Sequence, residues 1–132
     1  MTRAVSLLGP ALAYLVGIFV LGSVRFSAAP GHVSDKTAHF VVFGLLVLPM
    51  ARALRYFGDH PATERLGRGA LLSSLAGAAL EAWQALLPHR SAELLDWVAD
   101  TAGAFAVALV VAVVARLARG DAPAAPTSRE AP

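Results

Sequence analysis

The chain contains no cysteine and few charged residues. Without cysteine, its 132 residues hold neither a disulfide framework nor a thiolate metal site. Charged residues make up 15% of the sequence and hydrophobic residues 57%, and the charges are missing from four long stretches. A soluble domain needs a charged surface, so this distribution indicates a chain whose solvent is largely lipid. Since the formal net charge is only +2, no nucleic-acid partner is expected.

The four apolar stretches are each long enough to cross a bilayer as an α-helix. About 20 residues, rising ~1.5 Å each, cross a hydrocarbon core of about 30 Å. The stretches cover residues 4–24, 37–54, 69–87 and 94–115. The first stretch has a rival interpretation as a cleaved signal peptide, because residues 27–29 resemble a small-residue cleavage site. Its apolar run is longer than a signal core and three more stretches follow, so we favour an uncleaved helix.

The expected fold is an all-α membrane protein, a bundle of four transmembrane helices over residues 1–118. Residues 119–132, rich in Ala, Pro and Ser, are expected to form a disordered cytoplasmic tail. Arginine concentrates between the second and third stretches and after the fourth. The positive-inside rule then places both termini in the cytoplasm and the loops at residues 25–36 and 88–93 outside. A composition richer in alanine and arginine than in isoleucine and lysine is typical of a GC-rich bacterial genome, and the expected location is then the bacterial plasma membrane.

Polar residues gather near the outward ends of the last three helices, which spanning a membrane does not require. They are Asp35, Lys36, His39, Glu81, Gln84, Arg90, Asp96 and Asp100. At helical rise, His39 lies about 7 Å, Glu81 roughly 10 Å and Asp100 roughly 13 Å from the outward end of its helix. Ionisable groups on three helices thus reach similar depths from one membrane face.

These depths assume that Ser34 and Ser91 are helix N-caps and that Pro88 ends the third helix. Small residues lie on the same helix faces as the acids, Gly77 below Glu81 and Gly103 below Asp100, which allows close helix approach. An acid at mid-bilayer costs roughly 3 kcal/mol or more, so the polar faces should point inward. The available partners for the acids are Lys36, His39 and Arg90. Trp83 and Trp97 are expected to be interfacial anchors.

The order and spacing of these residues resemble two signatures of the VanZ-like family. The first is Asp35-Lys36-x-x-His39-Phe40-x-x-Phe43-Gly44. The second joins Glu81-x-x-Gln84-x-x-x-Pro88-x-Arg90-Ser91 to Asp96-x-x-x-Asp100-x-x-Gly103. The resemblance covers roughly residues 33–107. Relatives often carry asparagine at the position of Asp100 and a second glycine at that of Val107. The first departure adds an acid to the cluster, and the second implies looser packing of the last helix below it.

The resemblance implies a multipass bacterial membrane protein, and the founding member is associated with resistance to the glycopeptide teicoplanin. Three functions remain open for the polar residues. In the favoured one, Lys36 and Arg90 bind a phosphate or carboxylate of an anionic envelope lipid or glycopeptide. The second is a membrane-embedded hydrolase or transferase, in which a divalent metal or acid–base chemistry would involve Asp35, His39, Glu81, Asp96 and Asp100. Against it stands the absence of a Ser/His/Asp arrangement, an HExxH motif or a lipid-phosphatase pattern. The third is a structural clamp between helices.

Membrane lipids are the expected partners. We assign no metal site and expect no cofactor, and no oligomeric state follows from the sequence.

Overall fold

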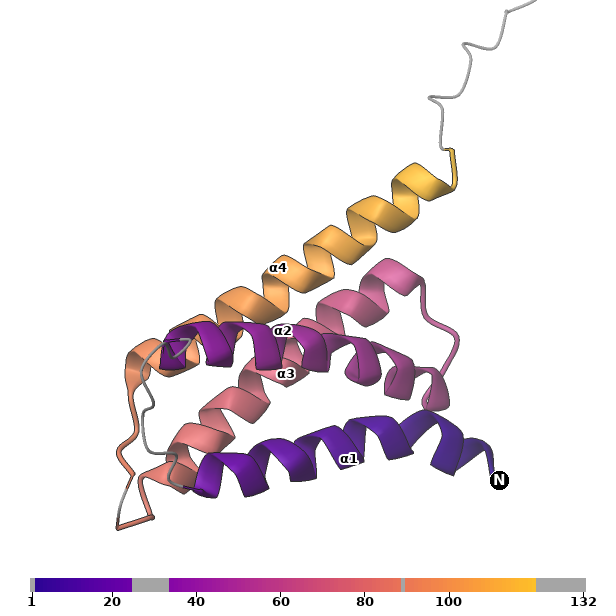
Figure 1. Cartoon of the computed structure of the whole chain (residues 1–132). Coiled ribbons are helices and arrows are strands. Elements are labelled where there is room, and N and C mark those ends of the chain that lie inside the picture. The colour runs from indigo at the N-terminus through magenta and orange to yellow at the C-terminus, as the bar shows by residue number, and fades with distance from the viewer. Residues whose placement is uncertain (1, 25–33, 89, 121–132) are drawn as a thin grey trace, which may run out of the picture.

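A computed structural model of the chain describes residues 2–24, 34–88 and 90–120. It contains α1 (Arg3–Ser23), α2 (Asp35–Ala53), α3 (Ala62–Gln84) and α4 (Leu94–Ala118), with a short 3₁₀ helix η1 (Leu54–Tyr56) continuing α2. Successive helices run in opposite directions, so the end of α3 and the starts of α2 and α4 lie at one end of the molecule (Figure 1). The expected all-α fold is confirmed. The residue 27–29 motif and nearly all of the predicted tail lie outside the described residues.

Two helix ends follow local sequence signals, the start of α2 at Ser34 and the end of α3 before Pro88. The starts of α3 and α4 do not. Ser34 caps α2 as predicted, because its Oγ accepts the backbone N–H of Thr37. The predicted start of the third helix at residue 69 is wrong, since α3 begins at Ala62, directly after Pro61. Apolar character marks only part of this helix, because its first two turns carry charged residues that form helices well in water. At its other end α3 stops at Gln84, one turn before Pro88.

The predicted cap at Ser91 is also wrong. The helix α4 begins at Leu94, and the preceding Glu93 makes no side-chain cap. Instead, the backbone N–H of Glu93 donates to the carboxylate of Glu81 on α3, at 2.7 Å. A contact from another helix thus takes up an amide beside the start of α4, so no local cap signal was needed in the sequence.

Three helices of the described chain are long and apolar enough to cross a membrane: α1, α2 together with η1, and α4. Each carries large apolar side chains on its outer surface, including Leu12 on α1, Leu45 on α2 and Leu109 on α4. The 23-residue α3 is as long, but its charged residues make it more polar. Pro10 and Pro49 lie inside α1 and α2, as membrane helices tolerate.

The helices α2, α3 and α4 form the packed centre of the molecule, and α1 lies at its edge. Each of the three central helices contacts the other two, whereas α1 contacts α2 and α3 but not α4. One apolar cluster joins Val47, Leu66 and Ala104 from the three central helices. A second cluster joins Ile18 of α1 to Phe43 of α2 and Leu80 of α3.

Glycines allow α2 and α4 to meet at backbone distance. A Cβ added to Gly103 would overlap the carbonyl group of Phe40. On the opposite helix, a Cβ on Gly44 would lie 3.0 Å from the carbonyl oxygen of Gly103 and 2.9 Å from Val107. The prediction that Gly103 permits close approach is therefore confirmed. The looser packing expected from Val107 is wrong, because its side chain occupies the space that Gly44 leaves and the helices pack tightly there.

Candidate functional site

A buried group of polar side chains lies where α3 ends and α2 and α4 begin. His39 is 8% exposed, Glu81 7%, Asp96 4% and Asp100 0%. These four residues come from the three central helices, so helix packing brings them together. All four are among the polar residues that the sequence singled out, and three of them, His39, Glu81 and Asp100, were expected at similar depths.

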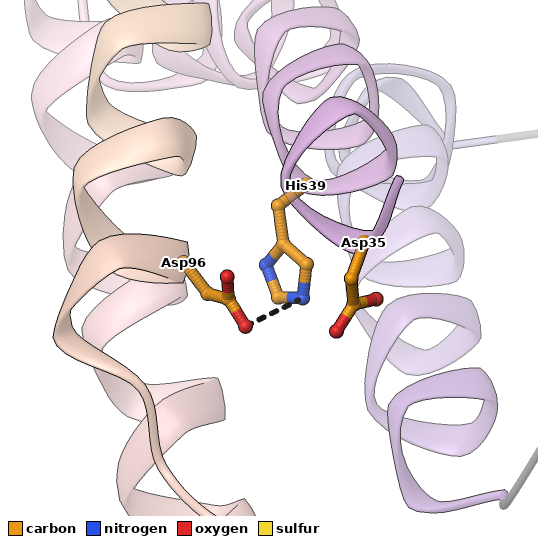
Figure 2. A group of neighbouring side chains, drawn as sticks. All are labelled: Asp35, His39 and Asp96. Carbon is orange, nitrogen blue, oxygen red and sulfur yellow. Dashed lines mark ion pairs between the residues drawn. The ribbon is translucent and has the colours of Figure 1, made fainter. Parts of the chain in front are cut away.

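His39 lies between two carboxylates of α4. Its Nδ1 is 2.9 Å from Oδ1 of Asp100, a hydrogen bond whose direction depends on the histidine tautomer. Its Nε2 is 4.0 Å from Oδ2 of Asp96, and Asp35 lies on the other side of the ring (Figure 2). The ring also stacks on Phe43, with centroids 6.1 Å apart. The hydrogen bond at Nδ1 and the stacking on Phe43 therefore restrict the orientation of His39.

Lys36 binds the start of α4. Its Nζ lies 3.0 Å from Asp96 and 3.1 Å from Glu93. The Asp96 carboxylate is buried, and the ammonium group of Lys36 compensates its charge. The side chains of Lys36 and Glu93 are about half exposed. This is the only lysine or arginine that pairs with an acid of the cluster among the described residues.

Two carboxylate oxygens in the cluster have no such compensation. Glu81 uses Oε2 to accept the backbone N–H of Glu93, but its Oε1 is buried with no hydrogen-bond partner among the described residues. Asp100 likewise bonds to His39 through Oδ1, while its Oδ2 is buried and unpartnered in the described chain. Gly77 leaves the space for this carboxylate, because a Cβ there would overlap Oδ2 of Asp100.

Gln84 and Arg90 bond to α1 and, among the described residues, to none of the acids. Both donate to the backbone oxygen of Gly22, Gln84 through Nε2 and Arg90 through Nε, each at 3.0 Å. Nearby, Trp83 donates to Ser23 of α1 at 2.8 Å. Arg90 forms no ion pair with an acid in the described part of the chain. A clamp made of ion pairs between these helices therefore does not involve Arg90.

A cavity of about 200 Å³ opens beside the cluster, between α1, α2 and α3. Its polar lining residues are Asp35, His39, Gln84 and Arg90. Its apolar walls come from α1, α2 and α3 and include Ile18, Leu21, Val42, Phe43 and Leu80. The cavity therefore joins the only cluster histidine to a cation and an apolar surface.

Below the cluster, hydroxyl groups connect the helices. Ser73 donates to the backbone oxygen of Phe43 at 2.6 Å, and Ser74 shares a 2.7 Å hydrogen bond with Thr101. Trp97 donates to the backbone oxygen of Ser74 at 3.2 Å. Trp83 and Trp97, predicted as interfacial anchors, thus both bond to neighbouring helices.

Sequence reasoning missed the parts of this site that are backbone groups. The amide of Glu93 and the carbonyl of Gly22 have no side-chain signature, so no pattern identifies them. In the sequence, Glu93 is only an acid directly before the fourth apolar stretch. Its ion pair with Lys36 follows only from the packing of α2 against α4.

Fold and site together define an all-helical protein with membrane-compatible helices that encloses a buried cluster of acids around one histidine. A family model described as VanZ/LLP1 matches residues 8–116. The chain therefore belongs to the VanZ/LLP1 family, as its two motifs indicated. The comparisons with curated proteins and with solved structures found no match.

Proposed function

We propose that this protein is a four-span protein of the bacterial plasma membrane whose outward pocket binds the anionic head group of an envelope amphiphile. The observation that carries the proposal is the cavity beside His39, whose lining combines Arg90 and the exposed acid Asp35 with apolar walls. A ligand with a phosphate or carboxylate and an attached acyl chain has the matching chemistry.

The proposed orientation puts this cavity on the outer face. Arg52, Arg55, Arg65 and Arg68 lie in or near the α2–α3 connection, and Arg116 and Arg119 lie at the end of α4. All are at the end of the bundle opposite His39. Positive charge at that end favours a cytoplasmic location, with both termini on the same side.

A fourth span follows from connectivity. If α2 and α4 both cross the membrane from the outside inward, the chain between them has to return across it. The helix α3 makes that connection and packs against both neighbours. Its polar residues are tolerable in this position because Ser73, Glu81 and Gln84 are buried against other helices and do not face lipid.

Arg90 is the proposed anion-binding residue. Its Nε is engaged by Gly22, whereas no described residue binds its two terminal nitrogens, which suit a phosphate or carboxylate oxygen. Lys36, the other candidate named from sequence, is already paired with Asp96 and Glu93. We therefore assign recognition of the anion to Arg90 alone.

The test compares lipid retention in purified variants. The wild type, Arg90→Ala and the control Arg55→Ala, an exposed arginine at the opposite end, are reconstituted in nanodiscs. Binding of a labelled phosphatidylglycerol is compared with that of phosphatidylethanolamine. We expect Arg90→Ala to weaken phosphatidylglycerol binding about tenfold, equal to the loss of one charge-assisted contact of ~1.4 kcal/mol. Equal binding in all three proteins would refute the proposal.

A parallel experiment decides between lipid and glycopeptide as the ligand. Teicoplanin is added to the same nanodiscs, and the teicoplanin susceptibility of a host expressing each protein is measured. Displacement of the lipid by teicoplanin, together with lower susceptibility that Arg90→Ala abolishes, would identify the glycopeptide. Lipid binding without either effect would identify the lipid.

A hydrolase or transferase is the second candidate, favoured by the position of His39. The residue lines the cavity while Asp100 binds its Nδ1, an arrangement used to orient a histidine for general acid–base catalysis. The expected result is release or exchange of a labelled lipid head group that His39→Gln abolishes while lipid binding persists. Failure of the wild-type protein to turn over any lipid in an envelope extract would exclude this candidate.

A further inference from the structure

The unpartnered oxygens of Glu81 and Asp100 require an explanation beyond head-group binding. Both side chains are more than nine-tenths buried, at 7% and 0% exposure, and each leaves one oxygen without a hydrogen bond among the described residues. A buried carboxylate oxygen without a donor or a cation is costly. The cost is greater in surroundings made of helices and lipid, where water does not compensate for a missing partner.

We propose that His39, Glu81 and Asp100 bind a divalent transition-metal ion. One ligand atom from each residue lies within 4.8 Å of the other two. Ligands about 2.1 Å from a metal are about 3.0 Å apart when adjacent at right angles and about 4.2 Å apart when opposite. The three ligand atoms therefore lie close enough together for modest side-chain movements to let them share one ion.

Charge supports the same assignment. The two carboxylates would bring two negative charges into the cluster, and a neutral imidazole adds none. Lys36 is not available to them, because it pairs with Asp96 and Glu93. A divalent cation at this position neutralises both carboxylates and gives the unpartnered oxygens a ligand bond.

The ligand set selects the kind of metal. One imidazole nitrogen with two carboxylate oxygens suits Zn²⁺ or Mn²⁺. Ca²⁺ and Mg²⁺ prefer oxygen ligands alone, and Ca²⁺ needs six or more of them. The absence of cysteine from the whole chain removes the thiolates that an iron–sulfur cluster requires.

A second group of residues competes for the same histidine. Asp35, His39 and Asp96 also offer ligand atoms within 4.8 Å of one another (Figure 2). In this group Asp96 already has Lys36 as its counter-ion, and Asp35 is exposed to solvent. Neither carboxylate therefore has an unmet need for a cation, which favours the group with Glu81 and Asp100.

The metal site does not depend on the proposed lipid function. It needs no part of α1 and no contact with Arg90, so the ion would bind whether or not an amphiphile occupies the cavity. His39 belongs both to the proposed metal site and to the lining of the cavity, so only this side chain would separate a bound ion from a ligand in the cavity.

The experiment measures metal content and thermal stability of the full-length protein in detergent, purified through a tag without histidine. The protein is treated with EDTA, and then Zn²⁺ or Mn²⁺ is added back. We expect about one ion per chain and a melting temperature that falls with EDTA and recovers with the metal. No bound ion after dialysis, or a melting temperature insensitive to both treatments, would overturn the proposal.

Variants locate the ion. Glu81→Gln and Asp100→Asn each keep the shape of the side chain, and each should lower metal affinity at least about tenfold. The matched control Asp35→Asn belongs to the competing group and should retain the ion. Loss of the ion in Asp35→Asn alone, or retention in all three variants as adventitious metal, contradicts the assignment. Arg90→Ala should keep the ion, which separates failure of this proposal from failure of lipid binding.

Discussion

The helices α1 and α4 are equally apolar, yet they have different positions in the molecule. Both are long enough to span a membrane and have the same mean hydropathy, but a smaller share of α1 is buried. The two helices diverge away from the site and do not touch (Figure 1). One difference is in what their glycines meet, since Gly103 of α4 meets the backbone of Phe40, whereas Gly22 of α1 meets only side chains and Gly17 has nothing within 4 Å.

The two helices therefore contribute to the site in different ways. The packing of α4 on α2 and α3 holds the buried acids against His39. The helix α1 contributes a wall of the cavity and is held partly by individual hydrogen bonds, from Tyr14 to Val42, from Arg52 to Ser6, and from Gln84 and Arg90 to Gly22. Between helices in lipid, apolar surfaces gain little by meeting each other, so association depends on close packing and on hydrogen bonds of this kind.

The largest expected effect comes from blocking the α2–α4 contact. Gly103→Ala puts a Cβ into the carbonyl group of Phe40, so the helices have to separate. We expect a loss of about 3 kcal/mol in stability, at the upper end for overpacked cores. Thermal unfolding in detergent measures it, with Gly17→Ala as the matched control that should change stability by less than about 1 kcal/mol. Equal effects would show that the two helices pack alike.

An intermediate effect is expected from a hydrogen bond inside the central helices. The hydroxyl of Ser73 on α3 donates to the backbone oxygen of Phe43 and is fully buried. Ser73→Ala removes the donor and leaves a small void, which should cost about 1 kcal/mol. Because the bond joins two central helices, the whole protein should unfold at a lower denaturant concentration in the same detergent.

The smallest effect is expected from the corresponding bond of α1. Tyr14 donates to the backbone oxygen of Val42, the residue next to Phe43 on α2, and this bond is only partly buried. Tyr14→Phe should cost roughly 0.5 kcal/mol. Hydrogen exchange should quicken in α1 and stay unchanged in α4. A loss as large as that of Ser73→Ala, or faster exchange in α4, would place α1 within the packed centre.

Much of the fold was accessible from the sequence because apolar length and polar interruptions are local properties. The stretches at residues 4–24, 37–54 and 94–115 correspond closely to helices, and Ser34 caps α2. The wrong predictions concern helix starts that are not apolar or that have no local cap signal. The start of α3 is charged and helical, and the start of α4 lies beside a contact with Glu81 and not at a serine cap.

The candidate site divides in the same way. Periodicity placed His39, Glu81 and Asp100 on inward faces at matched depths, and the structure brings them together. Periodicity did not say which acid binds which base. Lys36 pairs with Asp96, while Arg90 turns to a carbonyl of α1, because pairing depends on the distances between helices and on backbone groups without a sequence signature.

The sequence by itself determined that this chain is helical, that its helices suit a membrane, that it belongs to one family, and which polar residues share a depth. These properties follow from composition and spacing along single helices. Only the tertiary structure decided which helix lies at the edge, which carboxylate oxygens remain unpartnered, and that a cavity joins Arg90 to His39. Those properties depend on how closely the helices approach, which glycines such as Gly103 permit only where a neighbouring backbone is there to meet them.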